Sequence, residues 1–238
     1  MNSNIKYILF DLDGTLLPMD MDVFTRSYFK DLIKFSYTKG YDRSIDLVSV
    51  IWAGTGAMVK NDGSKTNGEA FWEKYSKETG RDGKKDEPMF DEFYATAFDN
   101  AKNYVGYTDE SAKTVNMLKE KGYKIILATN PIFPEVATDK RIKWAGLNKD
   151  DFMYVTTYEN STFAKPNPKY FSELLNKFDI RPEECLMVGN DAKEDACAID
   201  VGIDFFLITD CLVNSENKDI SVYNNGSFKD LRTYMGLE

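Results

Sequence analysis

Asp11 and Asp13 stand one residue apart near the start of the chain and are followed by Gly14. They come directly after an apolar and aromatic run over 7–10, which is typical of a strand buried on both faces of a parallel sheet. This spacing lets both carboxylates face the same side of a fading strand, and glycine permits the turn that follows. The pattern predicts two acids at the carboxyl end of a central strand, where open α/β sheets bind their ligands.

A strand that ends in Asp-Gly is also compatible with one half of a β-hairpin. The Asp13–Gly14 pair alone does not distinguish a strand of a parallel sheet from one half of a hairpin. A catalytic site at such a pair of acids needs further polar groups, and these must come from other segments.

Two later strands, predicted over 124–128 and 152–156, each precede side chains that suit a phosphate group. Thr129 and Asn130 directly follow the first strand, and Lys165 stands before a proline beyond the second. A threonine in this position can also do no more than cap a turn, and a single lysine is often only a solvated surface charge. Their shared position after successive strands favours the functional interpretation.

A fourth strand, predicted over 185–188, precedes a turn that contains Asn190, Asp191, Glu194 and Asp195. Because the chain contains no histidine, histidine-based nucleophile systems and histidine-ligated zinc sites are excluded. Carboxylates, lysine, threonine and a hard cation that prefers oxygen ligands remain. The alternative is that these acids only cap a helix and interact with its dipole.

In this order the four segments resemble the sequence motifs of the haloacid dehalogenase superfamily. Most members of that superfamily are magnesium-dependent phosphohydrolases or phosphotransferases. The resemblance implies that Asp11 attacks phosphorus to form an aspartyl-phosphate, while Asp13 protonates the leaving group and then activates water. It also implies that Thr129, Lys165 and the backbone N–H groups of Leu12 and Asn130 bind the phosphoryl oxygens.

The resemblance further implies a Mg²⁺ site formed by the Asp11 carboxylate, the Asp13 backbone carbonyl and the Asp191 carboxylate. Asn190 departs from the commonest form of the fourth motif, which has Asp directly after the glycine. We therefore expect Asp191 to be the ligand, with Asp195 orienting Lys165 or a metal-bound water. Glu194 is a rival for that supporting position.

Three other functions are weighed against a phosphohydrolase. A phosphotransferase such as a sugar-phosphate mutase would use the same residues, whereas dehalogenating members lack the acid at position 13. A receiver-like signalling domain would accept a phosphoryl group without turnover, but the helical insertion and the position of both acids on the first strand disfavour it.

The order of the predicted elements indicates an α/β fold with a Rossmann-like parallel sheet wrapped by helices. Residues 1–18 and 105–238 form this predicted core domain. A final strand over 205–208 follows the four named above. The core helices are predicted over 109–121, 134–145, 167–178, 193–201 and 228–235.

Residues 19–104 are predicted to form an all-helical cap domain. Its helices are expected over 21–38, 43–59, 67–79 and 88–104, with hinges near 17–19 and 105–108. Aromatic residues recur at helical spacing over 71–75 and 90–98, and such stripes usually form a bundle core. The candidates for contact with the leaving group are Thr55, Lys60, Asn61 and Trp72.

Composition limits the partners of this 238-residue chain. A formal charge of −9 argues against general affinity for nucleic acid or anionic membranes. We expect a small phosphorylated metabolite as the substrate, attracted by a local positive centre such as Mg²⁺. The three cysteines lack a Cys-x-x-Cys spacing, and no signal peptide or membrane span is recognisable, so we expect reduced thiols and a cytoplasmic location.

Overall fold

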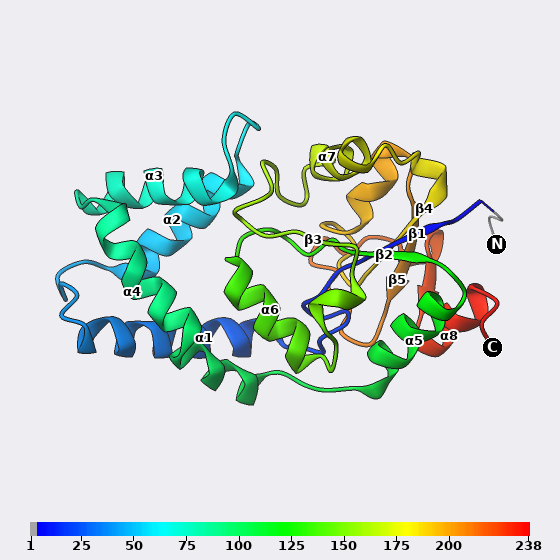
Figure 1. Cartoon of the computed structure of the whole chain (residues 1–238), viewed down its shortest axis with the longest axis horizontal. Helices are drawn as coiled ribbons and strands as arrows, with labels where there is room; N and C mark the ends of the chain where they lie inside the picture. Colours follow the sequence, from blue (N-terminus) through cyan, green and yellow to red (C-terminus); the bar gives the residue numbers. More distant parts are fainter. Residues whose placement is uncertain (1–3) are drawn as a thin grey trace.

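The computed structural model describes residues 4–238, and its centre is a six-stranded parallel sheet (Figure 1). The strand order is β3-β2-β1-β4-β5-β6, so β1 lies between β2 and β4. The strands are β1 (Tyr7–Phe10), β2 (Lys124–Leu127), β3 (Tyr154–Val155), β4 (Cys185–Gly189), β5 (Asp204–Ile208) and β6 (Asn224–Gly226).

The two faces of the sheet are covered by different helices because side chains alternate along each strand. Ile8 and Phe10 join one apolar cluster with α5 (Asp109–Glu120), α6 (Glu135–Trp144) and α8 (Phe228–Tyr234). Leu9 joins a second cluster with α7 (Lys169–Phe178) and the 3₁₀ helix η4 (Ala196–Val201). Figure 1 shows α7 on one side of the strands and α5 and α8 on the other.

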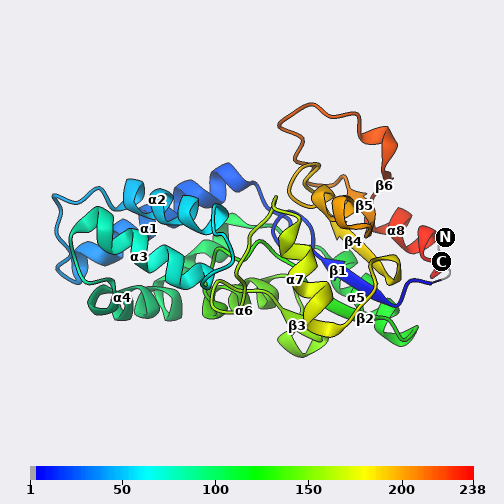
Figure 2. The ribbon, with the colours of Figure 1, turned by 90° about the horizontal axis from the view of Figure 1, so that it is seen from above.

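A group of helices forms the end of the molecule opposite the two termini (Figures 1 and 2). These helices are α1 (Met21–Thr38), α2 (Leu47–Val59), α3 (Asn67–Thr79), α4 (Gly83–Ala95) and the 3₁₀ helix η1 (Ala97–Tyr104). Asp20 caps α1, and a Thr66–Glu69 capping box begins α3. We call this group the helical cap.

The cap packs on the sheet domain through a continuous apolar cluster. Phe98 of η1 lies with its ring centroid 5.2 Å from that of Trp144 in α6. The two connecting segments also pair, since Gly106 donates its N–H to the Pro18 carbonyl at 2.7 Å. These segments lie beside the predicted hinges, while the exact domain boundaries stay a prediction.

The predicted fold class is confirmed, and several predicted element bounds are wrong. The helix predicted over 88–104 begins earlier, at the N-cap Asp82, and breaks at Thr96 into α4 and η1. The backbone of Thr96 has φ −123° and ψ −80°, which is outside the helical region. Pro88 lies inside α4, because packing of the helix's aromatic face outweighs the loss of one backbone donor.

Other differences concern short elements. The helix predicted over 43–59 starts at Leu47, the strand over 152–156 has only two paired residues, and the helix over 193–201 is a 3₁₀ segment from Ala196. Strand β6 carries Asn224, Asn225 and Gly226, which have low strand propensity, and was not predicted. No helix in residues 4–238 has the length and apolarity required to cross a bilayer.

Candidate active site

The polar segments that follow β1, β2, β3 and β4 meet at one edge of the sheet. β1 is hydrogen-bonded to both β2 and β4 in parallel register, so the carboxyl ends of these three strands lie together. The register continues past the strands, because the N–H of Asp11 donates to the Val188 carbonyl at 2.9 Å. The predicted site segments are therefore brought together by the strand order.

Lys165 joins two of the predicted site residues. Its Nζ donates to Asp11 Oδ1 at 2.9 Å and to Asp195 Oδ1 at 2.6 Å, and the lysine is only 1% exposed. The other oxygen of Asp195 accepts the backbone N–H of Asp191 at 2.9 Å. Asp195 thus fixes the lysine head and the start of the acidic turn, and contact with Lys165 is one of the two roles that the sequence analysis expects for it.

Burial and charge oppose one another in this cluster. Burial raises the pKa of Asp11 to about 7, with Lys165 opposing this and the charges of Asp195 and Asp13 adding to it. Burial alone would lower the pKa of Lys165, but the two carboxylates hold it well above its ordinary value. Lys165 therefore stays charged in this site. Ionised Asp11 beside it is unfavourable in free energy unless a further positive charge is present.

Asn130 and Thr129 are held in place by bonds to their surroundings. The Asn130 side chain accepts the N–H of Lys165 at 3.2 Å and donates to Glu194 Oε2 at 2.9 Å. The backbone carbonyl of Thr129 accepts the hydroxyls of Thr156 at 2.7 Å and Tyr170 at 3.0 Å. These bonds fix the loop after β2 against the lysine loop.

The turn after β1 is closed by Thr15 and Asn190. The Thr15 hydroxyl lies 2.9 Å from Asn190 Oδ1 and 3.3 Å from Asp11 Oδ2, and Asn190 Nδ2 donates to the Cys211 carbonyl at 2.7 Å. Gly14 has φ +84°, and a Cβ there would lie 2.3 Å from Asn190 Nδ2. Asn190 therefore packs against the turn after β1, and glycine is required for this approach.

The predicted backbone ligand Leu12 is fully buried at the start of the same turn. Its carbonyl accepts the N–H groups of Thr15 at 3.2 Å and Leu17 at 2.8 Å. These bonds fold the chain tightly after Asp11 and set the direction of the peptide units around the carboxylates.

Asp191 and Glu194 lie in the turn after β4. Asp191 Oδ1 accepts the backbone N–H groups of Lys193 at 2.7 Å and Glu194 at 2.9 Å, as the capping alternative predicts. Burial raises the pKa of Glu194 to about 7, with Lys165 opposing and the nearby acids adding. Gly189 makes room for this arrangement, because a Cβ there would lie 2.1 Å from Asp195 Oδ2.

Asp13 has a partner that sequence reasoning missed. Its Oδ2 forms an ion pair with Arg141 of α6, whose side chain is fully buried and stacks over the Phe133 ring at 4.4 Å. Burial raises the pKa of Asp13, and Arg141 and Lys165 oppose that shift. Arg141 falls four residues after Ala137 and four before Ala145, so the helical period alone places it on the buried face.

The charge balance of the site suits a divalent cation. The acids Asp11, Asp13, Asp191, Glu194 and Asp195 accompany the two cations Lys165 and Arg141. Asp13 Oδ1 is also buried without a hydrogen-bond partner among the described residues. Within residues 4–238 no three His, Cys, Asp or Glu side chains are grouped to hold a metal, so a Mg²⁺ site here would require backbone and water oxygens besides carboxylates.

The four cap candidates occupy different surroundings. Thr55 and Trp72 line a cavity between the cap and the sheet domain. Asn61 is buried and donates to the Asn67 side chain at 2.9 Å, whereas Lys60 is exposed on the surface.

Asn67 is a second residue that sequence reasoning missed. Its Nδ2 lies 3.1 Å from the carbonyls of both Pro131 and Phe163, which belong to the loops that carry Thr129 and Lys165. The N-terminus of α3 is thereby joined to the loops of the site.

Sequence comparison places the chain among known proteins. Residues 5–199 match the family model described as haloacid dehalogenase-like hydrolase. The chain belongs to this family. It is also 27% identical over 187 residues to the pyrophosphatase PpaX of Bacillus cereus, a match that covers 79% of this chain and 75% of that protein. The predicted family membership is confirmed, and the chain is a hydrolase of this family.

Solved structures share its fold at low identity. A HAD phosphatase from Thermococcus onnurineus is 21% identical with a TM-score of 0.60, covering 98% of this chain and 99% of its own. A predicted phosphoglycolate phosphatase from Haemophilus somnus 129PT is 20% identical with a TM-score of 0.61 at the same coverage. A 2-haloacid dehalogenase from Pseudomonas syringae is 17% identical with a TM-score of 0.65, covering 98% of both chains. At these identities the likeness concerns the fold.

Proposed function

We propose that this chain is a magnesium-dependent phosphohydrolase that acts on a small phosphate monoester through an aspartyl-phosphate. The observation that carries the proposal is the contact of Lys165 with both Asp11 and Asp195, beside a second acid, Asp13, with one unpartnered oxygen. A dehalogenase, which forms its ester without protonating a leaving alcohol, has no use for an acid at position 13.

The first step is attack on phosphorus by the Asp11 carboxylate. Hydrolysis of a phosphate monoester is among the slowest uncatalysed reactions, so several interactions must lower its barrier together. Lys165 neutralises phosphoryl oxygens, and Thr129 and the N–H groups of Leu12 and Asn130 bind the others. Mg²⁺, held by Asp11, the Asp13 carbonyl and Asp191, would supply charge neutralisation when bound.

Asp13 moves the proton in both half-reactions. In this proposal its Oδ1, which is buried without a protein partner among the described residues, exchanges the proton with the leaving oxygen. Arg141 holds Oδ2 and fixes the carboxyl group while the proton is transferred. The same group then takes a proton from the water that hydrolyses the aspartyl-phosphate.

The names of the similar proteins agree with a small phosphorylated substrate. They include a pyrophosphatase and a predicted phosphoglycolate phosphatase. A phosphotransferase would use the same residues, and no contact in the site favours it over hydrolysis. The cytoplasmic location stays a prediction.

Hydrolysis of phenyl phosphate with and without Mg²⁺ tests the proposal. We expect turnover that requires Mg²⁺ and that Asp11→Asn abolishes, while Asp150→Asn at an exposed position retains it. Absence of turnover by the parent protein would contradict the proposal, and a stable phosphoprotein without turnover would identify a receiver.

A further inference from the structure

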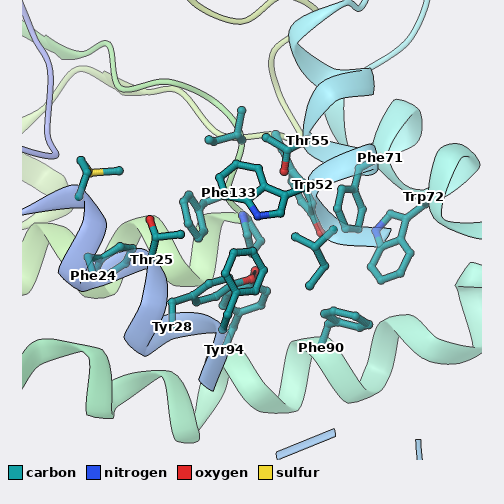
Figure 3. Close-up of a pocket in the computed structure, with 16 residues that line it drawn as sticks. Phe24, Thr25, Tyr28, Trp52, Thr55, Phe71, Trp72, Phe90, Tyr94 and Phe133 are labelled. Carbon is teal, nitrogen blue, oxygen red and sulfur yellow. Dashed lines mark hydrogen bonds between the residues drawn. The ribbon is translucent and has the colours of Figure 1, made fainter. Parts of the chain in front are cut away.

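A cavity of about 100 Å³ lies where the helical cap meets the loop after β2. We call it the aromatic cavity because its wall consists mainly of rings, among them Phe24, Tyr28, Trp52, Phe71, Trp72 and Phe133 (Figure 3). Figure 3 shows these side chains pointing toward one another from the helical cap and from the core loop. None of the lining residues is charged.

The aromatic cavity adjoins the catalytic loops. Ile132 and Phe133 of its wall come directly after the segment Thr129–Pro131, and the N–H of Ile132 donates to the Asn130 carbonyl at 2.8 Å. Phe133 stacks on Arg141, which pairs with Asp13. One guanidinium group therefore separates the cavity wall from the acid that protonates the leaving group.

We propose that the aromatic cavity binds an uncharged, ring-bearing leaving group of the phosphate monoester. This inference rests on the proposed function and specifies its substrate class. The leaving oxygen must lie at Asp13, and Arg141 connects this acid to the wall formed by Phe133.

The lining excludes charged leaving groups. Burial of a phosphate or carboxylate without a charged partner costs several kcal/mol, and the cavity wall offers no Lys or Arg. The hydroxyls of Tyr28 and Tyr94 lie 2.8 Å apart and bind each other, so these two residues present their rings. The cavity therefore disfavours the leaving groups of pyrophosphate and phosphoglycolate.

The size of the cavity suits one ring. A dry apolar cavity of ~150 Å³ binds benzene, and the aromatic cavity is smaller, at about 100 Å³, so one ring is the upper limit of what its volume can hold. Trp52 lines the cavity and is 54% exposed, with its ring 5.6 Å from that of Phe29. The wall of the cavity at Trp52 is therefore also in contact with solvent.

The experiment compares benzyl phosphate with ethyl phosphate, whose leaving alcohols have similar acidity. The ratio of their kcat/KM values then reports how well the protein accommodates the ring. In the parent protein we expect this ratio to exceed about tenfold, which is in the range that a few apolar carbons contribute. Phosphoglycolate should be a poorer substrate than benzyl phosphate.

A variant that fills the aromatic cavity, compared with a matched control, tests whether the preference for benzyl phosphate arises there. Thr25 lines the cavity from α1, and Thr38 is exposed at the end of the same helix. Thr25→Phe should reduce the benzyl-to-ethyl ratio about tenfold, whereas Thr38→Phe should leave it unchanged. Thr25→Phe should likewise weaken inhibition by benzylphosphonate but not by ethylphosphonate, which reports binding without turnover.

The outcomes separate the two proposals. If the parent hydrolyses neither ester with Mg²⁺, the proposed function fails and the substrate inference fails with it. If it hydrolyses both but prefers phosphoglycolate, or if Thr25→Phe leaves the benzyl-to-ethyl ratio intact, only the aromatic cavity assignment is overturned.

Discussion

Two buried carboxylates of this chain each contact a basic side chain, but only one of them is fully matched. In the helical cap, Asp86 accepts hydrogen bonds from Arg81 Nε at 2.5 Å, Arg81 Nη2 at 2.6 Å and the Tyr75 hydroxyl at 2.8 Å. In the sheet domain, Asp11 shares the single ammonium group of Lys165 with Asp195. The cap therefore balances its acid, whereas the candidate active site has more acids than cations.

The pKa values of Asp86 and Asp11 reflect this difference in charge balance. Burial raises the pKa of Asp86, but the bonds from Arg81 and Tyr75 outweigh it, so the pKa lies below its ordinary value. Burial raises the pKa of Asp11 to about 7 because Lys165 does not compensate fully. A matched network stabilises the fold, while an excess of buried acids costs stability and provides a site for a cation or a phosphoryl group.

The largest expected effect comes from removing the cation of the unbalanced site. Lys165→Met leaves Asp11 and Asp195 side by side without a positive partner, so kcat/KM on phenyl phosphate should fall by at least about 10³-fold. Steady-state kinetics measures this loss. Lys169→Met, at an exposed position at the start of α7, is the control and should change kcat/KM less than twofold. A kcat/KM within tenfold of the parent value would contradict a catalytic role for Lys165.

A smaller effect is expected at the acidic turn. If the excess negative charge serves Mg²⁺, Asp191→Asn should weaken Mg²⁺ binding by about 10- to 100-fold, because one charged ligand is lost. Calorimetric titration with Mg²⁺ measures the affinity directly. Asp200→Asn, at an exposed position of η4, serves as the control. If Asp191→Asn binds Mg²⁺ as tightly as the parent does, Asp191 is not a Mg²⁺ ligand. Its role would then be to accept the backbone N–H groups of Lys193 and Glu194.

Much of the fold could be predicted because local patterns agree with it. The helices predicted over 21–38 and 67–79 match α1 and α3, each of which begins at a side-chain cap. The unbroken apolar strands likewise predicted a parallel sheet. The bounds of α4 were wrong because tertiary packing carries this helix across Pro88, which local propensity does not reveal.

The residues that sequence reasoning missed act over long distances in the chain. Arg141 lies close to Lys140 and Lys143, and such a group of basic residues is typical of a solvent-exposed helix face. Only its position in the helical repeat indicates that Arg141 is buried. Asn67 begins a cap helix but binds carbonyls in two core loops. No local pattern predicts such a partner, because it depends on how the cap packs against the sheet domain.

The matched acid of the cap should affect stability without affecting catalysis. Asp86→Asn removes the charge that Arg81 binds, and we expect the free energy of unfolding to fall by about 2 kcal/mol at pH 7. This loss of stability is moderate because the Arg81 side chain is 39% exposed and solvent screens its charge. Urea unfolding measures the change, and kcat on phenyl phosphate should stay within threefold of the parent. Glu78→Gln breaks a more exposed ion pair with Lys74 and should cost less than about 0.5 kcal/mol.

The pH dependence of that stability gives the finest test of the comparison. Because the folded-state pKa of Asp86 lies below its unfolded value, its contribution is present above the unfolded pKa of about 3.9 and is lost as pH falls through the folded pKa. The difference in unfolding free energy between the parent and Asp86→Asn should therefore be constant from pH 7 to 5 and should shrink below pH 4. Urea unfolding of both proteins at pH 7, 5, 4 and 3 measures it. A difference that persists unchanged at pH 3 would mean that Asp86 stabilises the cap through packing and neutral hydrogen bonds, and the contrast with Asp11 would then not be one of charge balance.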